Sequence, residues 1–153
     1  MRFWQFKRFL AAFAAALVGV GAFVGARCFS VCRLSAIEGT RTFYLHSPSS
    51  QALCKTTLSI FDIFSLQGEC VRFEWQKQGF GQTDSLKVIA EEIATFYGAE
   101  ILFFENAGSS LSVYCYSPRL VGGIDVYGEW VNLHIALRGN ACAVGTPLIF
   151  DGF

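Results

Sequence analysis

The sequence predicts an α+β domain in which one main α-helix packs on a curved antiparallel β-sheet, preceded by a hydrophobic N-terminal segment. Three observations support this. Several short segments alternate apolar and polar residues with the period of two typical of strands. One segment has apolar residues at helical spacing. Phe9 to Ala26 contains no charged or strongly polar residue. We expect seven or eight strands and one long helix in the domain.

The N-terminal segment has two interpretations. Met1 to Arg8 is short and basic, and the apolar run after it is long enough to cross a bilayer, which takes roughly 17 to 25 residues. The same pattern forms the n-region and h-region of a secretory signal, and Val24-Gly25-Ala26 is an acceptable cleavage site. Residues 1–26 are therefore a signal peptide or a transmembrane anchor. Either way, we expect an extracytoplasmic domain that is membrane-anchored or secreted.

The rest of the chain forms one domain. Residues 27–38 are predicted to be a juxtamembrane linker, and residues 39–153 a single α+β domain. Twelve basic and twelve acidic residues give a formal net charge of zero. Non-specific nucleic-acid binding usually needs a clustered basic face. The charge balance therefore argues against a nucleic-acid partner.

The first part of the domain is predicted to contain three strands. Thr40 to Leu45 is the first, and Gln51 to Phe61 the second. Gly68 to Gln76 is the third, because Val71, Phe73 and Trp75 alternate with polar residues. The connection from Asp62 to Gln67 is compatible with a strand or with a helical turn.

One clear helix follows a glycine-rich break. Its apolar stripe should pack on the sheet, with Thr83 or Asp84 as the cap and Gly98 as the left-handed stop. The stripe consists of Leu86, Ile89, Ala90, Ile93 and Tyr97. Glu100 to Glu105 is an unbroken apolar run between two acids and predicts a central strand. A loop at residues 106–110 should return the chain into an antiparallel strand from Leu111 to Tyr116.

The C-terminal stretch predicts a hairpin. Val131, Leu133, Ile135 and Leu137 alternate with less apolar residues, and Gly139-Asn140 can supply the positive φ of a tight turn. In the second strand, residues 142, 144, 146, 148 and 150 share one face. Pro147 cannot donate to a ladder, so this strand is predicted to lie at a sheet edge or to bend there.

Two short sequences in this hairpin resemble a known family. Residues 132–138 (NLHIALR) and 144–149 (VGTPLI) resemble the C-terminus of the YwmB family, and Phe43 to Ala52 resembles shorter members more weakly. The resemblance covers about the last quarter of the chain. It implies a fold like that of the TATA-box-binding protein. It also implies a small envelope-associated protein of endospore-forming bacteria, with no established activity and with a role during sporulation.

The catalytic and metal motifs that we considered are incomplete. Six cysteines in an exported chain are compatible with disulfides or with free thiols, and both remain open. No CxxC occurs, and we expect neither a metal nor a cofactor. A Cys/His hydrolase would use Cys54 with His46 or His134, but Cys54 falls in a strand-like run rather than at a helix N-terminus. The serines at 47, 49 and 50 lie in no G-x-S-x-G elbow.

The leading functional hypothesis is a non-catalytic protein-interaction domain at the cell envelope. Its partners would be envelope or membrane proteins, with residues 9–26 in the membrane if they are not cleaved; no small-molecule ligand is evident. The sheet face or edge would bind. The candidate binding residues are His46, Ser47, Ser49, Ser50, Gln51, Asn132, His134 and Arg138. The alternatives are a cell-wall or glycan-modifying enzyme and a membrane-anchored DNA-binding regulator.

Overall fold

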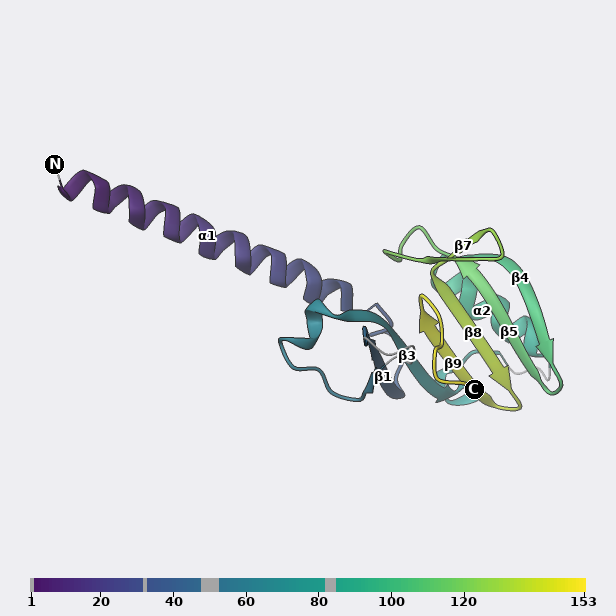
Figure 1. Cartoon of the computed structure of the whole chain (residues 1–153). Helices are drawn as coiled ribbons and strands as arrows, with labels where there is room; N and C mark the ends of the chain where they lie inside the picture. Colours follow the sequence, from purple (N-terminus) through teal and green to yellow (C-terminus); the bar gives the residue numbers. More distant parts are fainter. Residues whose placement is uncertain (1, 32, 48–52, 82–84) are drawn as a thin grey trace. The chain divides into compact units, whose positions relative to one another are not determined.

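The chain forms two compact units. The computed structural model describes residues 2–31, 33–47, 53–81 and 85–153, with side chains described from residue 8 to 26 in the first helix (Figure 1). The units are Met1–Cys32 and Arg33–Phe153.

The first unit is a single helix, α1 (Arg2–Val31). Its stretch Arg8–Ala26 spans 19 residues and is apolar and long enough to cross a membrane. At 1.5 Å per residue this stretch measures about 28 Å, close to the roughly 30 Å of a bilayer's hydrocarbon core. The described side chains on it are almost all exposed. The predicted signal or anchor is therefore present as an apolar helix.

The second unit is α+β, built on a seven-stranded antiparallel sheet with strand order β2-β1-β3-β9-β8-β5-β4. The strands of the sheet are β1 (Thr40–Leu45), β2 (Leu53–Lys55), β3 (Leu66–Glu74), β4 (Glu100–Ala107), β5 (Ser110–Tyr116), β8 (Leu133–Arg138) and β9 (Ala141–Thr146). A separate two-stranded hairpin consists of β6 (Ile124–Val126) and β7 (Glu129–Val131). Two short 3-10 helices, η1 (Asp62–Phe64) and η2 (Trp75–Gln78), flank β3.

The main core lies between the sheet and α2 (Leu86–Phe96), which Figure 1 shows behind β5 and β8. Ile89, Ala90 and Ile93 are fully buried against inward-facing residues of β5 and β8. Leu34 and Ile37 belong to the same core. The prediction of a linker over residues 27–38 is therefore wrong in its second half, because these two apolar residues already contribute to the domain.

The segment after β9 covers part of the opposite face. Residues 147–153 pack over a small cluster formed by Tyr44, Cys70, Ala136 and Ala143. Gly145 permits this close approach, since a Cβ there would lie 2.8 Å from Cγ1 of Ile149. Asp151 fixes the segment by accepting hydrogen bonds from the Tyr44 hydroxyl and, at 2.7 Å, from Arg72.

Several predicted elements are confirmed. β1 and the β4–β5 and β8–β9 hairpins occur where the sequence places them, and the helix stops before Gly98, whose φ is 59°. The predicted caps Thr83 and Asp84 lie outside the described residues. The predicted strand over residues 51–61 is wrong in length, because β2 covers only Leu53–Lys55 and residues 51–52 are not described. The ambiguous connection contains the helical turn η1.

The sheet order corrects two further predictions. β4 is an edge strand rather than a central one. A bulge between Ile101 and Phe103 interrupts its alternation, so apolar residues of both faces follow one another in the sequence. β9 lies between β3 and β8 and is not an edge. It ends at Thr146, so the bend expected at Pro147 is present. A break at Asn132 separates β7 from β8.

Candidate functional site

Asn132 is a structural residue of the loop that joins β5 to β8. It is 1% exposed. Its side-chain oxygen accepts a hydrogen bond from the Ser117 N–H at 2.7 Å, and its amide donates to the carbonyls of Ser117 at 2.8 Å and Leu120 at 2.9 Å. The prediction that it lies on a binding surface is wrong, because every contact just named holds the protein's own backbone.

His134 is also buried, at 8% exposed, which corrects the prediction of a surface role. Its ring stacks on Tyr114 with 4.5 Å between centroids, and its Nδ1 accepts a hydrogen bond from the Ile149 N–H at 3.3 Å. Burial lowers the pKa of His134 to about 4, so the ring is neutral at pH 7. Strand alternation correctly puts it on the face away from α2, but nothing in that pattern indicates that residues 147–153 cover it.

The other predicted binding residues lie apart from these two. His46 is exposed at the end of β1, where its Nδ1 is 3.0 Å from Nε2 of Gln67, and Ser47 is half-buried beside it. Arg138 is exposed at the end of β8, over the ring of Phe153. Ser49, Ser50 and Gln51 lie outside the described residues. Among the described residues, the structure therefore does not bring the predicted binding residues of the segment 46–51 into one site with those of the segment 132–138.

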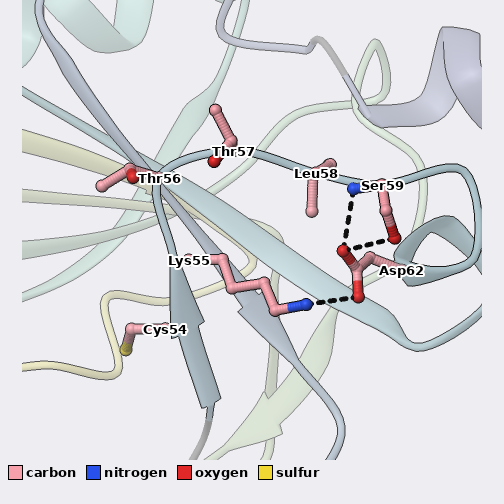
Figure 2. A pocket seen from close by; sticks show the side chains of 7 residues that line it. All are labelled: Cys54, Lys55, Thr56, Thr57, Leu58, Ser59 and Asp62. Atoms are coloured by element: carbon pink, nitrogen blue, oxygen red, sulfur yellow. Dashed lines mark hydrogen bonds and ion pairs between the residues drawn. The ribbon is translucent and has the colours of Figure 1, made fainter.

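A shallow hollow of about 610 Å³ lies at the connection between β2 and β3, lined by residues 54–59 and Asp62. Figure 2 shows Lys55 and Ser59 reaching toward Asp62 from two sides. Lys55 contacts one carboxylate oxygen at 2.6 Å, and the Ser59 N–H and hydroxyl both donate to the other at 2.8 Å. Lys55 and then Ser59 lower the pKa of Asp62 to about 2. Both carboxylate oxygens of Asp62 thus make contacts that stabilise the β2–β3 connection.

The described thiols are unsuited to nucleophilic catalysis. Burial raises the pKa of Cys70 to about 11 and that of Cys115 to about 12, and it also raises the pKa of Cys142 and Cys54. A catalytic cysteine needs a lowered pKa. In Figure 2 the sulfur of Cys54 points away from Asp62. His134, the other partner considered for Cys54, is occupied by Tyr114 and Ile149.

A buried carboxylate fixes the point at which the chain enters the domain. Glu69 of β3 is 2% exposed, and its Oε1 accepts a hydrogen bond from the Leu34 N–H at 2.8 Å. Arg41 lies 3.7 Å from its Oε2 and donates to the Leu34 carbonyl at 3.1 Å. Burial raises the pKa of Glu69, while the Leu34 N–H and Arg41 oppose the rise. The Arg33 side chain donates to the Val121 carbonyl. These contacts tie Arg33 and Leu34 to β1, β3 and the β5–β6 connection.

The strongest candidate binding surface is the edge of the sheet at β4, which sequence analysis missed. No described strand pairs with its outer side. Beside it, on the face away from α2, Phe103 stacks on Tyr114 with centroids 4.5 Å apart, and Tyr114 stacks in turn on His134. The Tyr114 hydroxyl donates to Glu105 at 2.7 Å. We call β4 together with Phe103, Glu105 and Tyr114 the edge surface.

Tyr127 borders the edge surface from the β6–β7 turn. Its φ is 55°, a left-handed conformation that costs a bulky residue roughly 1 kcal/mol or more. The ring lies 6.0 Å from that of Phe103 and is 84% exposed. The Asp125 carboxylate accepts a hydrogen bond from Gly128 N–H at 3.2 Å and supports the turn. The edge surface thus has an exposed aromatic ring at its border.

Comparisons of the chain with protein-family models, with curated proteins and with solved structures found no match.

Proposed function

We propose that this protein is a membrane-tethered, non-catalytic domain of the cell envelope that binds a protein partner by adding a strand to the edge surface. The observation that carries the proposal is the open, eight-residue edge strand β4 of a large antiparallel sheet. Such an edge presents unpaired backbone N–H and C=O groups to an extended polypeptide. The helix α1 supplies the tether.

The two edges of the sheet differ in what they offer a partner. β2, at the other edge, has only three residues. β4 is long enough for a partner strand to form a ladder, and the half-buried rings of Phe103 and Tyr114 lie beside it. Backbone pairing supplies affinity in this recognition mode, and the neighbouring side chains supply specificity.

Charge indicates the chemistry of the partner strand. β4 carries Glu100 and Glu105 and contains no basic residue. Opposite charges on directly paired strands stabilise a sheet, whereas like charges destabilise it. A partner strand with Lys or Arg at alternate positions therefore suits this edge.

The family resemblance supports a finer proposal. The residues that resemble the YwmB family include all of β8 and the second half of β9, two paired strands in the interior of the sheet. We propose that the arrangement is a variant of the fold of the TATA-box-binding protein. A role in sporulation rests on the same resemblance. A structure of a YwmB family member with a different strand order would refute the relation.

The experiment that tests the proposal combines location with contact. Intact host cells carrying the tagged protein are treated with protease, and the mass of the mature chain is read from the same cells. A photo-reactive residue is then placed at Asn106 on β4. We expect external digestion, a mature chain that retains residues 1–26, and a discrete crosslinked partner.

The matched control places the same photo-reactive residue at Gln76, an exposed residue of η2 away from the edge surface. We expect no discrete crosslink there. Phe104→Lys should weaken the crosslink from Asn106, since a lysine on an edge strand opposes pairing. A domain that stays protected until the cells are lysed, or equal crosslinks from both positions, would refute the proposal.

A further inference from the structure

The exposed apolar side chains of the domain are concentrated at one end of the sheet. This end, which we call the entry end, is where β3, β8 and β4 begin and where β9 and β5 finish. All the large hydrophobic side chains of the described domain that are more than half exposed lie in β2 or in the two connections that lead into β3 and β8 at this end. They are Leu53, Ile60, Phe61, Phe64, Val121, Tyr127 and Trp130.

Two loops carry nearly all of these side chains. The β2–β3 connection presents Ile60 and Phe61, and Phe61 is 81% exposed. The β5–β8 connection presents Val121 and Trp130, and its β6–β7 hairpin lies across the end of the sheet in Figure 1. Exposed apolar groups gathered in this way mark an interaction site, whereas single scattered ones do not.

The far end of the sheet has the opposite character. Its turns are the η2 region after β3, the β4–β5 turn and the β8–β9 turn. Among the described residues, these three turns contain no large hydrophobic side chain that is more than a third exposed. Their exposed residues are polar, charged or small, including Glu74, Lys77, Ser109 and Asn140. The apolar character of the entry end is therefore not a general property of the surface.

The covalent connection to α1 leaves the entry end little freedom to move away from a membrane. Leu34, held by Glu69 at the entry end, follows the last residue of α1, Val31, by three positions. Three residues span at most about 11 Å. Helical residues 27–31, beyond the apolar stretch, add about 7 Å. The chain from the end of the apolar stretch to Leu34 can therefore span at most about 18 Å, and the headgroup layer outside the hydrocarbon core takes up roughly 5 to 7 Å of that length.

We propose that the entry end docks on the lipid headgroup layer of the membrane that α1 crosses, with Phe61, Val121 and Trp130 at the interface. Aromatic side chains favour this layer, because it is apolar on one side and hydrated on the other. The strands then run away from the membrane, and the polar far end is the part most distant from it. The docking rests on the proposed function in one respect, namely that α1 is retained.

The test uses the full chain reconstituted in vesicles of phosphatidylcholine and phosphatidylglycerol. Trp4→Phe removes the tryptophan of α1 and leaves Trp130 and the buried Trp75. Phosphatidylcholine with bromine near the headgroup end of its acyl chains then quenches tryptophan at the interface. We expect the brominated lipid to lower the tryptophan emission of the Trp4→Phe chain. It should not lower the emission of the chain that carries both Trp4→Phe and Trp130→Phe. Equal emission in brominated and ordinary vesicles would overturn the docking.

Paired variants locate the contact. Phe61→Asp combined with Val121→Asp should reduce the quenching of Trp130, whereas Val88→Asp, at a part-exposed valine of α2, should leave it unchanged. Unchanged far-UV circular dichroism checks that each variant is folded. An equal loss of quenching in both proteins would overturn the placement of the interface.

The two proposals fail in different ways. A mature chain cleaved after Ala26 in the host would remove the tether and, with it, the docking. An anchored chain that crosslinks through β4 but shows no lipid quenching would overturn the docking alone.

Discussion

Replacing Asn132 with Asp should make the stability of the domain depend steeply on pH. The variant keeps an acceptor for the Ser117 N–H, but its second oxygen replaces an amide that donates to two carbonyls, at 2.8 and 2.9 Å. A carboxylate has no proton to donate, so the fold selects the protonated acid. The pKa of the new side chain is therefore raised in the folded state.

The size of the effect follows from the displaced pKa. An unfolded aspartate has a pKa of about 3.9, and each pH unit above it costs about 1.4 kcal/mol for as long as the folded state keeps the proton. Below about pH 4 the protonated acid can donate to only one of the two carbonyls, so the free energy of unfolding is already somewhat below that of the natural protein; it falls further as the pH rises. At pH 7 the loss reaches about 4 kcal/mol, a large part of the stability of an ordinary domain.

Urea unfolding of the full chain in detergent micelles, followed by fluorescence between about pH 4 and pH 7, measures this difference from the natural protein. Asn140→Asp is the matched control, since Asn140 is exposed in the β8–β9 turn. It should show little change. A difference for Asn132→Asp that stays constant across the pH range would refute the hydrogen-bond assignment.

Three further predictions concern the core and the covered face. Ile93→Asp should lower the free energy of unfolding by about 4 kcal/mol or more, because an unpaired charge enters the core. Thr95→Asp, on the exposed side of α2, should be tolerated. Equal melting temperatures for the two variants would show that a different face of the helix packs on the sheet. The pKa of His134 is about 4 in the folded protein and about 6.5 in the unfolded chain. The free energy of unfolding should therefore be at its full value above pH 6.5 and should fall by up to about 3 kcal/mol as the pH drops to 4. His134→Gln should remove this slope and His46→Gln should not, as measured by urea unfolding. Asp151→Asn should speed the removal of residues 147–153 by carboxypeptidase, because it weakens the contacts of Asp151 with Arg72 and Tyr44. Glu91→Gln should leave the rate of removal unchanged. Equal rates for the two variants would show that these contacts do not hold the segment.

Local patterns predicted the elements that depend on local physics. The stripe of α2, its stop at Gly98 and the turn at Gly139 all follow from helical spacing and from the need for positive φ. The sheet order does not follow, because a strand's neighbours are chosen by packing across long separations. Thus β4 reads as central although it is an edge, since its bulge hides the alternation.

The candidate site was predictable only where burial depends on the strand itself. Alternation puts His134 and Leu133 on opposite faces, as observed. Covering of His134 depends on the path of the chain after Pro147, which the alternation does not contain. Asn132 occupies a strand-like run but breaks it, and its role emerges only once Ser117 and Leu120 are seen beside it.

The position of β9 has a consequence for how the domain is made. β9 follows every other strand in the sequence, yet in the sheet it joins β3 on one side to β8 on the other. Until the ribosome has released Thr146, the two halves of the sheet have no ladder between them. A chain threaded through an export channel during synthesis would therefore stay open until late, and closure of the sheet would take place on the far side of the membrane.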